Sequence, residues 1–227
     1  YFLIGIYKLA HLPFLRENTI SFPFLLRFPG IVADLVTVWA VFQIAKSAES
    51  KIPAWALILF ALSPVSLMIT GFHGNTDPIM VMVLTVATLA AILDKPILCG
   101  LFFALSCQIK IIPLLFLPIF FFYWRERRLA LKFIVPTALT FLILWAQPLF
   151  NFPIAFAKNV LSYGSFWGLW GVTYWLRQTG WSEFSRVTYH HFTPEQALVC
   201  TVLKLSIIAI VLSIAWRRRY LGRESLI

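Results

Sequence analysis

The stretch Pro96–Trp124, "PILCGLFFALSCQIKIIPLLFLPIFFFYW", decides how this chain is threaded. It is apolar except at Gln108 and Lys110, and Pro113 and Pro118 interrupt it. A membrane-spanning helix needs about 20 apolar residues, so the stretch is too long for one crossing and short for two. The number of crossings fixes the membrane side of every segment that follows.

The composition of the chain is that of an integral membrane protein. Of its 227 residues, 60% are hydrophobic and 12% are charged, and the mean hydropathy is +0.85. Other apolar runs approach the length of a membrane span; they are Pro29–Lys46, Pro53–Gly71, Pro78–Asp94, Leu129–Gln147 and Gln196–Trp216. Most Lys and Arg residues lie at the ends of these runs, as membrane topology requires, so the formal net charge of +10 does not indicate nucleic acid as a partner.

Two basic clusters decide between one and two crossings of the 96–124 stretch. Cytoplasmic loops of membrane proteins carry an excess of Lys and Arg. Two crossings place Arg125–Arg128 and Arg217–Arg219 on the cytoplasmic side, whereas one crossing places both clusters outside. We therefore predict a short hairpin with its tip at Lys110. Each arm has about 14 residues, or roughly 21 Å, so the tip needs surrounding protein or water within a hydrocarbon core of about 30 Å.

A second polar segment, "GFHGNTDPIM" (Gly71–Met80), emerges on the same outer face as this tip. A Lys within an apolar hairpin is costly unless it is paired or hydrated, which favours a functional role over snorkelling to the interface. Asp77 followed by Pro78 also predicts the start of a helix, with Asp77 as its capping residue. We expect one cavity on this face, lined by His73, Asn75, Asp77, Gln108 and Lys110.

The sequence predicts an all-α, polytopic transmembrane bundle of about seven membrane helices, including the short hairpin, with an outer juxtamembrane helix. We expect an extracytoplasmic juxtamembrane segment at 1–28 and a transmembrane bundle at 29–147, which contains the 96–124 hairpin. An aromatic extracytoplasmic loop follows at 148–195. The last span and a basic cytoplasmic tail occupy 196–227.

The aromatic loop has two interpretations. Its centre contains Trp167, Trp170 and Tyr174 among small residues. Trp and Tyr favour the headgroup level of a membrane, so these side chains can belong to an interfacial aromatic belt. Alternatively, their rings form a stacking platform for a sugar or a lipid.

The order of three motifs resembles the C-type glycosyltransferase superfamily, integral membrane enzymes that take a sugar from a polyprenyl-phosphate carrier. The motifs are "LLRFPGIVADLVTVW", "GFHGNTDPIM" and "LFFALSCQIKIIPLLFLP". The closest similarity is to mannosyltransferases and their bacterial relatives. In these enzymes a loop with His, Asn and an acid borders the active site, and it maps onto His73, Asn75 and Asp77. A Lys followed by a Pro at a later outer tip maps onto Lys110 and Pro113.

The resemblance also implies what is absent from the chain. The superfamily carries an essential acid in the first outer loop, after the first span. No acid of this chain matches that setting, so we expect the chain to begin inside that loop, with the general base upstream of Tyr1. The function that the resemblance implies is the transfer of a hexose, which we expect to be mannose, on the extracytoplasmic or lumenal face.

The implied partners are membrane lipid, a polyprenyl-phosphate sugar and a glycan, lipid or protein acceptor. Lys110, His73, Asn75 and Gln108 would stabilise the donor phosphate or line the cavity, and Asp77 would orient groups or bind the acceptor. The sequence requires no cofactor. A divalent metal has no support in the sequence.

Two other functions remain open at this point. A transporter or lipid flippase would also explain charged residues within apolar segments, but it predicts repeated halves, and no internal repeat is visible. A non-catalytic membrane subunit could keep the same fold without the chemistry.

Overall fold

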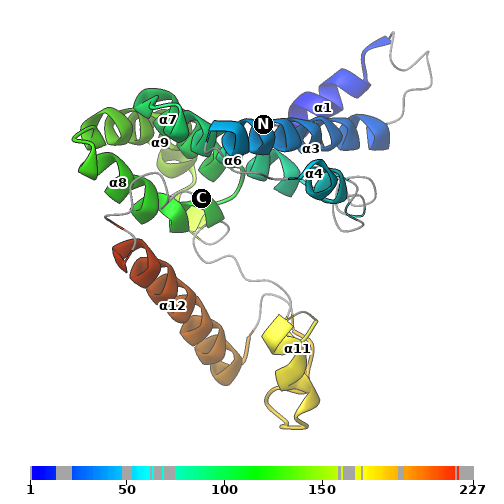
Figure 1. Cartoon of the computed structure of the whole chain (residues 1–227). Coiled ribbons are helices and arrows are strands. Elements are labelled where there is room, and N and C mark those ends of the chain that lie inside the picture. Colours follow the sequence, from blue (N-terminus) through cyan, green and yellow to red (C-terminus); the bar gives the residue numbers. More distant parts are fainter. Residues whose placement is uncertain are drawn as a thin grey trace. The chain divides into compact units, whose positions relative to one another are not determined.

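The computed structural model describes residues 2–13, 22–47, 53–61, 63, 68, 75–157, 160, 167–169, 171–188, 192–217 and 219. These residues are helical apart from turns and one isolated β-bridge, which confirms the all-α prediction. The helices are α1 (Phe2–Ala10), α3 (Phe22–Ser47), α4 (Ala54–Ala61), α6 (Asp77–Ile92), α7 (Pro96–Ile109), the 3₁₀ helix η2 (Ile112–Phe116), α8 (Leu117–Glu126), α9 (Ala130–Asn151), α10 (Pro153–Phe156), α11 (Gly171–Gln178) and α12 (Pro194–Arg217) (Figure 1).

Proline marks where many of these helices begin. It occupies the first turn of α6, α7, α8 and α10, and it is the first residue of α12. A proline in the first turn costs no hydrogen bond, because the first N–H groups of a helix have no partner within the helix. The fixed φ of proline also suits the helical turn. The prolines in the sequence therefore mark where these helices start.

Three helices are long and apolar enough to cross a membrane: Phe24–Ser47 within α3, Ala130–Asn151 and Pro194–Arg217. The shorter α6 and α7 are also apolar. These helices match four of the predicted apolar runs. The fifth, Pro53–Gly71, is described only in part, as α4 and two isolated residues. One boundary differs from the expectation. The helix that contains the run predicted from Pro29 begins earlier, at Phe22, because the residues before the proline, which are apolar except for Arg27, continue the same helix.

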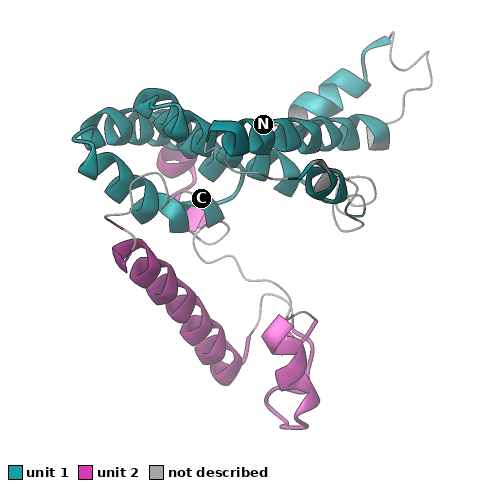
Figure 2. Cartoon of the chain, in the orientation of Figure 1, with its two compact units in different colours: residues 1–145, 220–227 teal, residues 146–219 magenta. Residues whose placement is uncertain are grey.

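The structure divides into two compact units, Tyr1–Trp145 with Tyr220–Ile227 and Ala146–Arg219 (Figure 2). In the first unit, α6 packs against both α3 and α7. Its core combines small residues with aromatic rings contributed by α7, α8 and α9. The buried core residues are Ala87, Ala90, Ala91, Cys99, Phe103, Cys107, Phe120, Tyr123, Trp124 and Phe133. The rings of Phe103, Phe120 and Phe133 lie 5.3 to 6.0 Å apart, so three helices share one aromatic cluster.

Gly100 allows α7 and α9 to approach closely. A Cβ at this position would lie 2.4 Å from the Phe133 carbonyl oxygen and 2.9 Å from Thr137 Oγ1. The Thr137 hydroxyl is within hydrogen-bonding distance of two backbone oxygens, Phe133 O at 2.7 Å and Gly100 O at 3.3 Å. A glycine is therefore required here, since any side chain would push the two helices apart.

The predicted hairpin breaks at Lys110. The helix α7 ends at Ile109, and Lys110 itself is extended, with φ −147° and ψ 147°. The chain then returns through η2 and α8, and Trp124 near the end of α8 donates a hydrogen bond from Nε1 to Cys99 Sγ near the start of α7, at 3.5 Å. The two arms are thus antiparallel, and α7 has the 14 residues expected of a short arm.

Candidate functional site

The two polar segments meet where α6 begins and α7 ends. The Lys110 ammonium forms an ion pair with the Asp77 carboxylate, and each side chain is 34% exposed. Asp77 lies in the first turn of α6 and Lys110 follows the last turn of α7. The N-terminus of a helix favours an acid and the C-terminus favours a base, so each charge lies at the helix end that stabilises it. The pair joins the adjacent ends of two antiparallel helices.

Asn75 extends this pair. Its Nδ2 donates to Asp77 Oδ2 at 2.6 Å, while the other carboxylate oxygen contacts Lys110. The carboxylate is therefore occupied on both oxygens by side chains that come from two separate parts of the sequence. This arrangement fixes the position of Asp77 and leaves the ammonium partly open to solvent.

One expectation about Asp77 is wrong. The helix α6 does start at this residue, with Pro78 in its first turn, as the sequence predicted. The residue in the capping position is Thr76, however, and it makes no side-chain capping bond. Asp77 is already the first residue of the helix, and its carboxylate contacts Lys110 and Asn75.

Gln108 contributes an amide without a partner among the described residues. Its Nε2 atom is buried and forms no hydrogen bond with any part of the chain that the structure describes. A buried donor in this state costs about 1–3 kcal/mol, and such atoms are rare in folded proteins. Gln108 precedes Lys110 by two residues, so an unused donor lies at the same helix end as the ion pair.

The remaining residues predicted for this cavity have different outcomes. His73 lies outside the described residues, so its place beside Lys110 stays a prediction. Pro113 is buried at the start of η2, directly after the break. Of the five predicted cavity residues, the structure places Asn75 and Lys110 each in contact with Asp77, with Gln108 on the last turn of α7.

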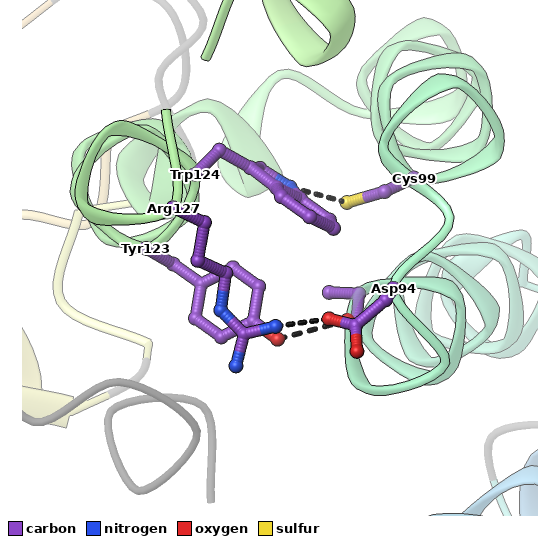
Figure 3. Close-up of polar contacts among 6 residues, drawn as sticks. Asp94, Cys99, Tyr123, Trp124 and Arg127 are labelled. Carbon is purple, nitrogen blue, oxygen red and sulfur yellow. Dashed lines mark hydrogen bonds and ion pairs between the residues drawn. The ribbon is translucent and has the colours of Figure 1, made fainter. Parts of the chain in front are cut away.

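A second ion pair, which sequence reasoning missed, lies between the end of α6 and the end of α8. The Arg127 guanidinium contacts the Asp94 carboxylate (Figure 3), and it lies 4.3 Å from the centroid of the Tyr123 ring. The Tyr123 hydroxyl donates to the Ala91 carbonyl at 2.9 Å. Asp94 and Arg127 stand in the turns that follow α6 and α8, and charged residues at the ends of apolar runs were the available signal in the sequence.

The aromatic residues proposed as a stacking platform separate into different environments. Trp167 is 1% exposed, its Nε1 donates to the Phe184 carbonyl at 3.0 Å, and its ring packs against Phe184. It therefore helps to build the loop. Tyr174 is exposed, with the Arg177 guanidinium 5.5 Å from its ring centroid. Trp170 lies outside the described residues. A sugar-stacking role for the three side chains stays a prediction.

The described residues contain no group of three or more His, Cys, Asp or Glu side chains that could hold a metal ion. His190 and His191, the adjacent histidines of the sequence, lie outside the described part of the chain. The absence of a metal and of a cofactor stays a prediction. The geometry itself offers a cation, an anion and amide donors, which suit binding of a phosphate group and orientation of a hydroxyl.

The comparisons with known proteins give one match. The family model described as Glycosyltransferase family 87 matches residues 12–226, nearly the whole chain. No curated protein and no solved structure matches the chain. The match covers both structural units, so it concerns the helical bundle and the aromatic loop alike.

Proposed function

Because the chain belongs to glycosyltransferase family 87, a family of integral membrane glycosyltransferases, we propose that it moves mannose from a polyprenyl-phosphate sugar to an acceptor hydroxyl. The reaction takes place on the extracytoplasmic or lumenal face, where the topology of the basic clusters puts Lys110. The acceptor is a glycan, a lipid or a protein. The observation that carries the proposal is the contact of Lys110 with Asp77 at the joined ends of α6 and α7.

The chemistry of the transfer needs a cation at this place. The acceptor oxygen forms a bond to the anomeric carbon, and the bond from that carbon to the phosphate oxygen breaks. The bonding pair stays on the phosphate, which gains negative charge, and the acceptor proton passes to a general base. An ammonium that is already in position stabilises this charge more in the transition state than in the ground state.

Lys110 is suited to this task because, among the described residues, its ammonium is held by the Asp77 carboxylate and its side chain stays partly exposed. A Lys ammonium has three N–H donors, and the Asp77 carboxylate is the partner that fixes its position. The 34% exposure of the side chain leaves donors free to meet a phosphate. Asp77, in turn, is oriented by Asn75, so we assign it the role of positioning Lys110.

The unpartnered Gln108 amide supports the same interpretation. Its buried Nε2 has no hydrogen bond among the described residues, and a phosphate oxygen or a sugar hydroxyl would supply one. A site that leaves a donor unpaired before its ligand arrives gains free energy when that ligand binds. We therefore include Gln108 among the residues that contact the donor.

A transfer assay tests the donor class. The protein is reconstituted in proteoliposomes and offered mannose that is labelled and carried either by polyprenyl phosphate or by a nucleoside diphosphate. We expect transfer from the polyprenyl-phosphate sugar alone. Transfer from the nucleotide sugar alone would contradict the proposal, whereas transfer from a polyprenyl-phosphate glucose in place of mannose would change only the sugar.

A further inference from the structure

The aromatic loop between α9 and α12 has an internal structure of its own. Trp167 and Thr188 form an isolated antiparallel bridge, in which the Trp167 N–H donates to the Thr188 carbonyl at 2.9 Å. Phe184 packs between two tryptophans, with ring centroids 5.5 Å from Trp167 and 5.8 Å from Trp181. The two ends of this segment are thus tied together around a buried indole.

Gln196 joins this segment to the first turn of α12. It is 0% exposed. Its Nε2 donates to the Glu183 carbonyl at 2.9 Å, and its Oε1 accepts from the Thr188 hydroxyl at 2.8 Å. The same amide forms a capping box with Thr193, since each residue bonds the backbone N–H of the other at 3.3 Å. The loop is therefore anchored to a candidate membrane span.

Helix α11 lies within this loop, and its contacts show which face is turned inward. The Gly168 N–H donates to Thr173 Oγ1 at 3.3 Å. The Arg177 side chain covers the Gly168 backbone, because a Cβ on Gly168 would lie 3.0 Å from Arg177 Cδ. The inner face of α11 thus includes the Thr173 hydroxyl and the charged Arg177 side chain, together with the half-buried Leu176.

The outer face of α11 carries two large apolar side chains, beside the exposed Gln178. Trp175 is 71% exposed and Val172 is 54% exposed. The two positions are three residues apart, so they lie on one side of the helix. A helix at a water-facing protein surface has the opposite pattern, with polar residues outside and apolar residues inside. This reversed pattern indicates an apolar neighbour.

We propose that α11 lies in the interfacial layer of the bilayer, with Val172 and Trp175 directed toward the acyl chains. The loop leaves one candidate span, Ala130–Asn151, and enters another, Pro194–Arg217, so both of its ends are at a membrane surface. Trp is the residue that most favours the boundary between headgroups and acyl chains. The proposal depends only on the membrane location of the chain and not on the identity of the sugar donor.

Quenching of a fluorophore tests this placement in the full-length chain in vesicles. In a Cys200→Ala background the two remaining cysteines, Cys99 and Cys107, are buried. Trp175→Cys or Val172→Cys then receives a polarity-sensitive label, and Glu183→Cys serves as the matched control, since the Glu183 side chain is exposed in the same loop. Quenching by lipids that carry a nitroxide near the headgroup is compared with quenching by aqueous iodide.

We expect the labels at 172 and 175 to be quenched roughly threefold more by the nitroxide lipid than the label at 183, and less by iodide. Equal access of iodide to positions 175 and 183 would overturn the proposal. A label at 175 that is shielded from both quenchers would also overturn it, because protein and not lipid would then cover the helix. The second labelled position keeps the test valid if one of the variants fails to fold.

Discussion

Helices α6 and α7 are antiparallel neighbours, and an ion pair lies at each end of this helix pair. The two ion pairs differ in what surrounds them. The Asp94–Arg127 pair is about as exposed as the other pair, but its guanidinium lies over the Tyr123 ring, and the Tyr123 hydroxyl donates to the Ala91 carbonyl of α6 (Figure 3). The Asp77–Lys110 pair has Asn75 beside it, and the same helix end carries a buried Gln108 Nε2 that has no hydrogen-bond partner among the described residues.

The backbone repeats the contrast. At the Asp94 end, both turns close with the same pattern of hydrogen bonds: Lys95 N to Ala90 O at 2.8 Å after α6, and Leu129 N to Trp124 O at 2.8 Å after α8. At the other end, α7 stops at an extended Lys110. Backbone and side-chain contacts thus close the Asp94 end, whereas among the described residues the other end keeps one buried donor, Gln108 Nε2, without a partner. We infer that the first end serves stability and the second serves chemistry.

The largest expected effect is that of Lys110→Ala on sugar transfer. Removing one preorganised donor to a developing charge lowers turnover by about 100-fold, or about 2.7 kcal/mol. Each side chain of the pair is about one-third exposed, so the free energy of unfolding should change by less than about 1 kcal/mol. Turnover per folded molecule and the thermal midpoint check both statements.

Lys95→Ala is the matched control for this variant. It removes an exposed Lys from the opposite end of the same helix, so transfer should be unchanged. If Lys95→Ala lowered turnover as much as Lys110→Ala, the distinction between the two ends would be lost.

Gly100→Ala affects the structure between the two ends. The added methyl would meet the Phe133 carbonyl oxygen at 2.4 Å, so α7 and α9 must separate. We expect a loss of roughly 2–3 kcal/mol in the free energy of unfolding, measured by thermal or chemical denaturation in detergent. Gly5→Ala, where nothing lies within 4 Å, is the control. Equal stability of the two variants would mean that the helices do not pack closely at Gly100.

Arg127→Ala tests the structural end directly. It removes the ion pair with Asp94 and the contact with the Tyr123 ring, and we expect a loss of about 1–2 kcal/mol in the free energy of unfolding. Turnover per folded molecule should stay at the wild-type value. The exposed neighbour Arg125, changed to Ala, should affect neither quantity. A catalytic defect in Arg127→Ala without a loss of stability would reverse the roles of the two ends.

The smallest effect is expected at Arg128. Its φ of 57° is a left-handed conformation that side chains disfavour, and it forms the turn after α8. Arg128→Gly should therefore raise the free energy of unfolding by about 1 kcal/mol. Arg128→Ala keeps the unfavourable φ and should give no gain, so an equal increase in thermal midpoint for both variants would assign the effect to lost charge.

Several features of the fold could be predicted from sequence because they follow from local chemistry. The apolar runs predicted the helices, Pro78 predicted the start of α6, and the position of Lys110 within an apolar stretch predicted the break in the hairpin. The start of α3 was predicted too late, at Pro29, since a proline was taken as a boundary although the apolar residues before it continue the helix.

Only part of the candidate site could be predicted from the sequence. The topology placed the segments of Asp77 and Lys110 on one face, and the structure brings the two side chains into contact. Their direct pairing, the Asp94–Arg127 pair and the orphaned Gln108 amide depend on the rotation of each helix about its axis. That rotation is set by packing around Gly100 and the aromatic cluster, which a single sequence does not reveal.

The burial of Trp167 and Gln196 in the loop could not be predicted from a single sequence either. Both were classed by composition, as an exposed aromatic residue and as the first residue of an apolar span. Both are buried, because a network of hydrogen bonds between distant residues encloses them. The sequence "TPEQ" at Thr193–Gln196 did contain the pattern of a capping box, which was the one readable signal.

The central claim is that the positive charge at position 110 binds the phosphate of the sugar donor. In a Cys200→Ala background, Lys110→Cys removes this charge, and alkylation with 2-bromoethylammonium restores an ammonium at nearly the same place. We predict that this alkylation recovers sugar transfer, while alkylation with neutral iodoacetamide does not. Recovery with both reagents, or with neither once mass spectrometry shows that position 110 is modified, would contradict the claim.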